Sequence, residues 1–260
     1  MILYQEYAPH PALRAYLSCL WTCSLPPTAA AGVTHRVLPD NGFDILWQNG
    51  NEQGFAVGMM QACLDVALPA LVHTLAVRFK PGAAAYFFDL PLSELTDRHA
   101  GLEQLWGRAC AGRIADGLWS QDLSERQRLD WLERQLLKQL RKQLQARQPA
   151  RADALVAGAV AAIEGSGGLL RIGALAAALS VSRQHLAVAF GQRVGLTPKM
   201  FARVCRFQRA SQQAGVQAEA AQAIDWAGLA LERGYFDQSH LIHDFQQFAG
   251  TSPDAFAARR

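Results

Sequence analysis

The chain has 260 residues, half of them apolar and 18% charged, with a net charge of +3. That length suits one large domain or two ordinary ones, and the composition is typical of a soluble globular protein. The longest apolar runs, of about ten residues, are too short to span a bilayer, and the N-terminus lacks the pattern of a signal peptide. Five scattered cysteines indicate reduced thiols, so we expect a cytoplasmic protein with no membrane partner.

The positive charge is unevenly distributed along the chain. Residues 1–150 contain 14 Lys and Arg and 14 Asp and Glu, whereas residues 151–260 contain 11 and 8. The whole excess of three charges therefore lies in the second part. An excess of positive charge favours a polyanionic partner for that part.

The first 90 residues have the pattern of a β-rich domain. Two apolar runs in "THRVLPDNGFDILWQNG" flank the turn cluster at 39–42, and "HTLAVRF" alternates apolar and other residues as a strand does. Residues 83–118 have a mixed or helical pattern. We expect an α+β fold overall, in which residues 1–120 form a barrel-like β-rich domain with helices.

An amphipathic helix is predicted within residues 121–150. Its leucines follow one another at intervals of three and four residues, at Leu129, Leu132, Leu136, Leu140 and Leu144. This stripe fits a helix packed on its own domain, and it also fits a dimerisation or signalling helix. "ARQPARAD" at 146–153 breaks the pattern and is the predicted linker.

Almost everything after the linker has a helical, Ala-rich pattern. We expect residues 151–260 to form an all-α domain. The predicted helices are at 152–164, 172–179, 182–192, 198–213, 219–232, 237–248 and 252–259.

One short pattern occurs twice in this helical part. "RQHLAVAFGQRVGLTPKMF" begins at Arg183 and "QSHLIHDFQQFAGTSPDAF" begins at Gln238, so equivalent residues are 55 positions apart. In each copy a Leu and a Phe four residues apart share one helix face, and a Gly then ends the helix. Thr-Pro or Ser-Pro starts the next helix with a cap and a proline. A short Ala/Leu helix and a tight turn precede each copy, which predicts two helix-turn-helix units.

The second helix of each unit carries candidate DNA-reading residues. A duplicated helical scaffold is the alternative interpretation, because Leu and Phe at helical spacing are usually core residues. The positions beside the apolar anchors are expected to face outward and to contact base edges and phosphates. They are Arg183, Gln184, Ala187 and Val188 in the first copy, and Gln238, Ser239, Ile242 and His243 in the second. Two readers on one chain could enter successive major grooves about 34 Å apart.

The second copy, "GYFDQSHLIHDFQQFAGTSPDAF", resembles the C-terminal signature of AraC/XylS-type transcription regulators, and the upstream copy resembles the matching first unit. The likeness covers Ala152 to Arg259. It implies a module that binds double-stranded DNA, with recognition helices at Ser182–Gln192 and Asp237–Phe248. Val188 and His243 stand where the family often has Arg. RNA polymerase is a further candidate partner.

The first half resembles an N-terminal domain of unassigned role that precedes some regulators of this type. The likeness rests on "VLPDNGFDILW" and "VRFKPGAAAYFF", and it implies effector binding and formation of a homodimer. The polar residues of interest are Asp40, Asp44 and Arg78, because a charge on an apolar strand requires a partner or a ligand. A salt bridge between Asp44 and Arg78 is one interpretation. A pocket lined by these residues with Trp21 and Trp47, in which Arg78 binds an acidic effector, is the other.

The sequence contains no Gly-rich phosphate loop, no nucleophile elbow and no zinc-spaced Cys/His set. We therefore expect neither an enzyme nor a bound cofactor or metal. His240 and His243 are spaced as metal ligands on a helix, but His240 matches His185 in the repeat, which favours a packing role. Two alternatives to an effector-controlled regulator stay open. One is a DNA-targeted enzyme with a methyl-accepting cysteine, and the other is a ligand-independent DNA-binding protein.

Overall fold

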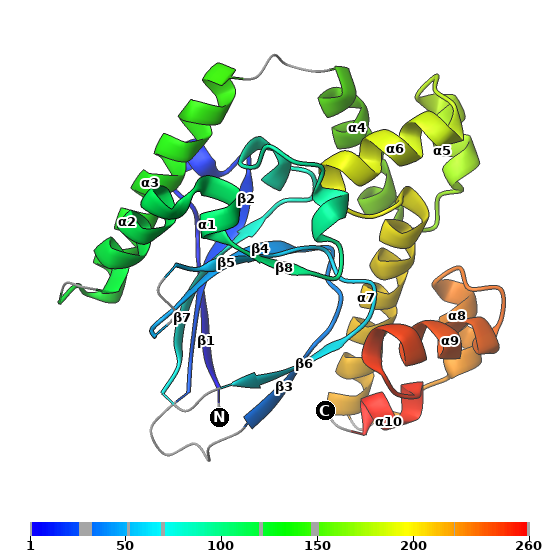
Figure 1. The fold of residues 1–260 in the computed structure, drawn as a ribbon. Coiled ribbons are helices and arrows are strands. Elements are labelled where there is room, and N and C mark those ends of the chain that lie inside the picture. Colours follow the sequence, from blue (N-terminus) through cyan, green and yellow to red (C-terminus); the bar gives the residue numbers. More distant parts are fainter. Residues whose placement is uncertain are drawn as a thin grey trace.

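The computed structural model describes residues 2–25, 33–50, 53–68, 71–119, 122–146, 151–220 and 222–258. Their strands form a six-stranded antiparallel sheet, ordered β1-β2-β7-β4-β5-β8, and a separate ribbon of β3 and β6 (Figure 1). The β-rich first half is therefore confirmed, as two sheets and not as a closed barrel. The strands are β1 Leu3–Tyr7, β2 Leu17–Ser24, β3 Val33–Val37, β4 Phe43–Gln48, β5 Phe55–Val57, β6 Leu64–Leu68, β7 His73–Phe79 and β8 His99–Gly101.

Three helices gather on one side of the large sheet (Figure 1). They are α1 (Leu102–Trp106), α2 (Arg108–Trp119) and α3 (Glu125–Ala146), and three short 3-10 helices accompany them. The 3-10 helices are η1 (Pro11–Leu13), η2 (Ala84–Tyr86) and η3 (Leu92–Leu95). Alternate residues of the strands, such as Phe43, Ile45 and Trp47 on β4, are buried beneath this helical layer.

The leucine stripe of α3 packs within the chain. Leu129, Leu132, Leu136 and Leu140 are all at most 4% exposed and belong to the core of the first half, whereas Leu144 is 43% exposed. The prediction of a helix packed on its own domain is thus confirmed. The predicted linker lies partly outside the described residues, at 147–150, and its last three residues are helical.

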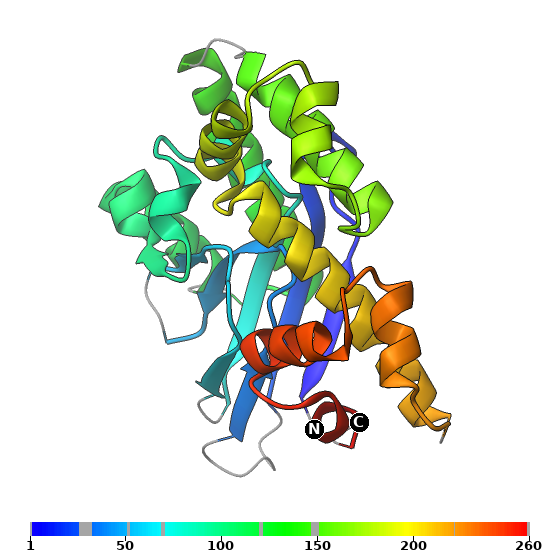
Figure 2. The same ribbon diagram turned by 90° about the vertical axis from the view of Figure 1, so that its right-hand side faces the viewer.

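The second half is helical, as predicted. Its helices are α4 Arg151–Ser166, α5 Ile172–Ala178, α6 Arg183–Val194, α7 Pro198–Glu219, α8 Trp226–Glu232, α9 Gln238–Ala249 and α10 Pro253–Ala257. Helix α7 runs between the α5–α6 pair and the α8–α9 pair (Figure 2). The predicted helix at 219–232 is wrong in its start: α7 extends to Glu219, and α8 begins only at Trp226, where Asp225 caps it.

Two hydrophobic cores hold these elements. The larger one joins the first half to α4, α5, α6 and the start of α7 without interruption, and it includes Phe190 and Phe201. The smaller one holds α8, α9 and α10 against the rest of α7, around Phe207 and Phe245. The first helix pair is therefore built into the N-terminal half, whereas the second has a core of its own.

Candidate nucleic-acid interface

The two predicted units have the same local construction. Ser182 and Asp237 cap α6 and α9, each accepting a hydrogen bond from the backbone N–H three residues on, at 3.1 and 2.8 Å. Each helix ends at a glycine in the left-handed region, with φ of 97° at Gly195 and 66° at Gly250. Pro198 and Pro253 then open the next helices. The repeat in the sequence is thus a repeat of helix-turn-helix units.

The eight predicted DNA-reading residues lie on corresponding faces of α6 and α9. Six side chains are exposed and two are half-exposed. The exposed ones are Arg183, Gln184, Val188, Gln238, Ser239 and His243, and the half-exposed ones are Ala187 and Ile242. Their neighbours at the anchor positions, Leu186, Phe190, Leu241 and Phe245, are fully buried. This alternation leaves the first turns of both helices available to a partner.

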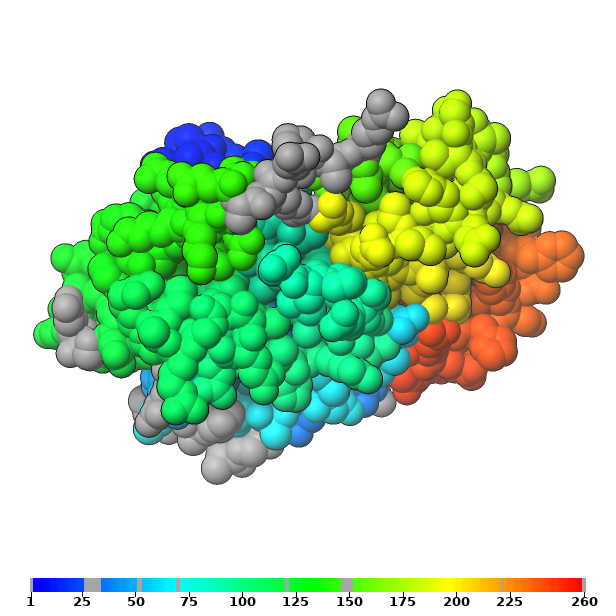
Figure 3. All heavy atoms as spheres, turned by 45° about the horizontal axis from the view of Figure 1, so that its top comes forward, coloured from blue at the N-terminus to red at the C-terminus, as the bar shows by residue number. Residues whose placement is uncertain are grey.

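The opposite ends of α6 and α9 contact the N-terminal half. Thr96 Oγ1 donates to the carbonyl of Gly195 just after α6. Near the end of α9, Gln247 Nε2 donates to the carbonyl of Gln61 at 3.0 Å, and Arg36 Nη1 donates to the carbonyl of Ala249 at 3.2 Å. Figure 3 shows the surface of the first half meeting the yellow residues of α6 directly, with the red second unit at the margin.

A buried ion pair fixes α9 on α7. The Asp244 carboxylate is fully buried, and Arg203 Nη2 contacts its Oδ1 at 2.6 Å. The same guanidinium donates to Gln247 Oε1 at 2.8 Å and lies 5.1 Å from the centre of the Phe248 ring. Sequence reasoning missed this pair, although an Asp on the apolar side of the predicted α9 was a visible signal that a cation must lie opposite it.

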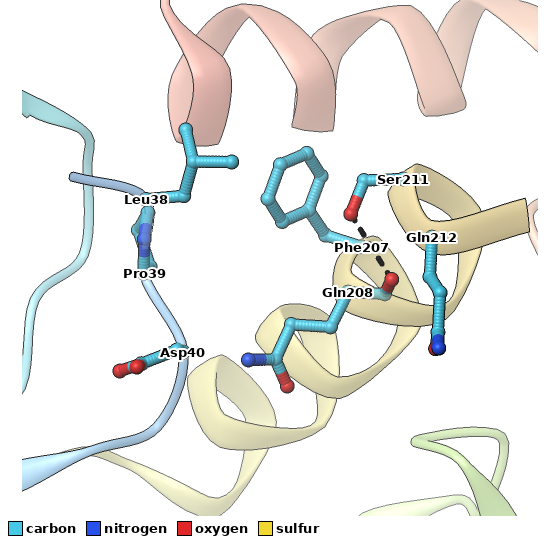
Figure 4. Close-up of a pocket in the computed structure, with 7 residues that line it drawn as sticks. All are labelled: Leu38, Pro39, Asp40, Phe207, Gln208, Ser211 and Gln212. Carbon is cyan, nitrogen blue, oxygen red and sulfur yellow. Dashed lines mark hydrogen bonds between the residues drawn. The ribbon is translucent and has the colours of Figure 1, made fainter. Parts of the chain in front are cut away.

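A turn of the N-terminal half also contacts α7. The Asn41 amide donates to the carbonyl of Phe201 and to the Cys205 sulfur, both at 3.2 Å, and Asn41 itself has a φ of 55°. Asn tolerates this left-handed conformation better than most residues. Leu38 of the same turn packs on the second core, and Figure 4 shows it pointing toward Phe207 across a hollow of about 280 Å³. The sequence indicated a turn here, but not its contact with a helix 160 positions away.

The polar residues predicted on the first half form one ion cluster. Arg78 contacts Asp44 through two hydrogen bonds of 3.1 and 2.9 Å, and it also pairs with Asp40 at 3.0 Å. Burial raises the pKa of Asp44, and the ion pair with Arg78 opposes that rise. The predicted salt bridge is present, with Asp40 as a second partner that the sequence interpretation did not pair.

The strand register separates the two predicted tryptophans. Arg78 lies opposite Asp44 on one side and opposite Cys19 on the other, so Trp21, two residues after Cys19, shares their face. Trp47 is three residues after Asp44, so it points to the opposite face, where it is completely buried. The structure therefore brings together four of the five predicted effector residues and places Trp47 in the core.

Further observations concern the cysteine and histidine side chains of the described residues. Burial raises the pKa of Cys19 to about 11 and also raises the pKa of Cys23, which disfavours a reactive thiolate. The described residues contain no group of three or more His, Cys, Asp or Glu side chains placed to hold a metal. The His240 ring instead lies against Tyr235, with centroids 5.3 Å apart.

Length and apolarity decide whether any of the described helices could span a membrane. None of them alone is long and apolar enough to cross a bilayer. One pair bent by 95°, Ile172–Ala178 with Arg183–Val194, passes by length and composition when its two helices are taken together. These two helices are α5 and α6 of the first unit.

Solved structures of ToxT from Vibrio cholerae are similar to the chain along most of its length. One, bound to (E)-4-(8-methylnaphthalen-1-yl)but-3-enoic acid, has 9% identity and a TM-score of 0.47, covering 99% of this chain and 98% of its own. Another, at 1.65 Å resolution, has 8% identity and a TM-score of 0.45 over the same shares. The wild-type protein of strain SCE256 with bound unsaturated fatty acid has 10% identity and a TM-score of 0.40, covering 99% and 94%. A similarity at this level gives no information about the positions of side chains.

Family models match both halves of the chain, whereas no curated protein sequence does. A model described as a domain of unknown function (DUF6597) matches residues 5–101, and one described as a helix-turn-helix domain matches residues 175–259. The second match contains both recognition helices, α6 and α9, and all eight candidate DNA-reading residues. The chain therefore joins an N-terminal DUF6597 domain to a C-terminal helix-turn-helix domain of the AraC type.

Proposed function

We propose that the protein is a transcription regulator that reads double-stranded DNA with α6 and α9 and is controlled through its N-terminal half. The observation that carries the proposal is the repeated unit. Both recognition helices present exposed residues on their first turns while their anchor residues are buried. Such helices read base edges in the major groove, and two of them on one chain replace the two subunits of a dimeric reader.

The two helices offer different chemistry to DNA. In α9, Gln238, Ser239 and His243 all have hydrogen-bonding groups, so this helix suits direct readout of base edges. In α6, Arg183 and Gln184 are polar, whereas Val188 has only methyl groups to offer, which suit a thymine methyl. We expect α9 to discriminate more strongly among bases than α6 does.

The test is selection of DNA by the full-length protein from a random-sequence pool at fixed salt, with Gln238→Ala and Gln184→Ala in parallel. We expect a motif of two elements about one helical turn apart, each variant degrading a different element. Loss of one base contact should weaken specific binding by about 1–3 kcal/mol. Recovery of no motif by the wild-type protein, or identical motifs from all three proteins, would contradict the proposal.

For effector control, we propose the half-exposed sheet face around Arg78 as the sensing site. Arg78 already pairs with two carboxylates, and an acidic effector would compete with the more accessible of them, since Asp40 is 33% exposed against 15% for Asp44. Asp40 adjoins Asn41, whose amide holds α7. Figure 4 shows the Asp40 carboxylate directed away from α7. Displacing it would therefore alter the turn that contacts the DNA-reading half.

Asp40→Asn tests this coupling without any known effector. The substitution removes the charge that pairs with Arg78 but keeps an oxygen that can accept from the Gly42 backbone N–H, at 2.8 Å in the wild type. We expect affinity for the selected DNA to change at least about fivefold, a modest coupling between sites. Asp130→Asn on α3, which removes an exposed ion pair with Arg126, is the matched control. If both variants bind DNA as the wild type does, the turn does not transmit a signal.

A further inference from the structure

The two helix-turn-helix units differ by one residue in the turn. Recognition helices and their caps repeat at an interval of 55, but the first helices, α5 and α8, repeat at an interval of 54, from Ile172 to Trp226. The turn hydrogen bonds locate the change. Val181 N donates to the carbonyl of Ala176 at 3.0 Å, and Tyr235 N donates to that of Ala230 at 2.9 Å, again 54 positions apart.

The additional residue is therefore Phe236, between Tyr235 and the cap Asp237. In the first unit, Val181 precedes the cap Ser182 and packs against the core. In the second unit Tyr235 takes that buried place, at 3% exposed, and Phe236 is pushed outward. Phe236 is 87% exposed, more than any other large apolar side chain in the described residues.

The exposure of Phe236 excludes the packing role that a hydrophobic residue before an N-cap usually has. A hydrophobic residue just before an N-cap commonly packs on the fourth helical residue, which in α9 is Leu241. Leu241 is completely buried whereas Phe236 is almost fully exposed, so this packing is absent between them. A free aromatic ring in water forgoes the stabilisation that burial would provide, which points to a partner outside the chain.

Phe236 adjoins the exposed first turn of α9, where Gln238 and Ser239 lie. Building on the proposed function, we infer that Phe236 is a specificity-determining residue of the second reader and packs on a thymine C5-methyl group in the major groove. The C5-methyl is the apolar group that a base presents there, and Phe is one of the side chains that contact it. An uncharged ring also adds affinity without neutralising phosphate, so this contribution does not depend on salt.

The experiment compares wild type and Phe236→Ala on the DNA selected by the wild-type protein, and on the same duplex with uracil in place of thymine. Uracil keeps base pairing and lacks only the C5-methyl. We expect Phe236→Ala to lose about five- to tenfold in affinity on thymine DNA, with an unchanged salt slope, and to bind uracil DNA as the wild type does. Leu231→Ala on α8, which removes a side chain that is 68% exposed, is the control and should bind as the wild type.

Three outcomes would overturn the inference. Wild-type affinity of Phe236→Ala on thymine DNA would show that the ring does not contact the duplex. An equal loss on thymine and uracil DNA would assign the ring to the sugar–phosphate backbone instead. A lowered melting temperature of Phe236→Ala would assign the loss to folding. Failure of the wild-type protein to select any DNA is a separate result, because it removes the proposed function before Phe236 is tested.

Discussion

The two helix-turn-helix units share a local design but differ in what supports them. The first shares a continuous core with the N-terminal half, and the Arg193–Asp153 ion pair ties α6 to α4 at 3.1 Å. The second has a separate core and contacts the N-terminal half through Leu38 and a few hydrogen bonds, such as those from Arg36 and Gln247. Repetition in sequence therefore does not imply equal attachment, and we expect the second unit to unfold locally at a lower free energy than the first.

The largest expected effect comes from deleting the equivalent aromatic anchors. Phe190→Ala and Phe245→Ala each remove a completely buried ring and should cost about 3–5 kcal/mol. The two variants should differ in how much of the chain each substitution destabilises. Phe245→Ala is expected to raise amide hydrogen exchange in α8, α9 and α10 only, whereas Phe190→Ala should raise it in the sheet as well.

The same hydrogen-exchange measurement can contradict this difference between the two helix-turn-helix units. Increased exchange throughout the chain in Phe245→Ala would show that the two cores unfold together. Exchange confined to α5 and α6 in Phe190→Ala would show that the first unit is as independent as the second.

A smaller effect is expected at the turn that touches α7. Asn41→Gly keeps the backbone conformation with a φ of 55° but removes both amide contacts, at a cost of about 1–2 kcal/mol. Cys205 reports the change through its burial, which raises the thiol pKa to about 11 and outweighs the lowering of that pKa by the Asn41 amide. We expect faster alkylation of Cys205 in the variant, measured by mass spectrometry of the digested protein.

The control for this prediction is Asn49→Gly, which alters another turn of the N-terminal half, where Asn49 contacts Leu71 and His73. It should leave the alkylation rate of Cys205 unchanged. An unchanged alkylation rate in Asn41→Gly would mean that the contacts of this turn with α7 do not keep Cys205 buried.

The sequence predicted what is local and repeated. Thr197 and Ser252 act as caps where the pattern placed them, because a cap depends on residues three positions away. Helix boundaries failed between α7 and α8. An Ala-rich stretch favours helix by its own propensity, and packing of the preceding segment decides where the chain turns.

The candidate effector site includes residues whose placement could be predicted from the sequence and one residue whose contacts could not. The pairing of Asp44 with Arg78 followed from placing charges on strands, and the exclusion of Trp47 was already contained in the two-residue period of a strand. The contacts of Asn41 could not be predicted in this way. Its contact with Phe201 and Cys205 depends on how the two halves dock, which no local pattern encodes.

Helix α7 has 22 residues, so it acts as a rigid rod about 33 Å long between the two units. A rod of this kind transmits angle as well as distance, since each residue added or removed would rotate one unit about the rod by about 100° relative to the other. If α6 and α9 read DNA as proposed, the length of this one helix sets the spacing and the helical phase of the two half-elements. A change in the spacing of the half-elements would then require an insertion or deletion in α7, whereas a change in base preference would require only substitutions on α6 and α9.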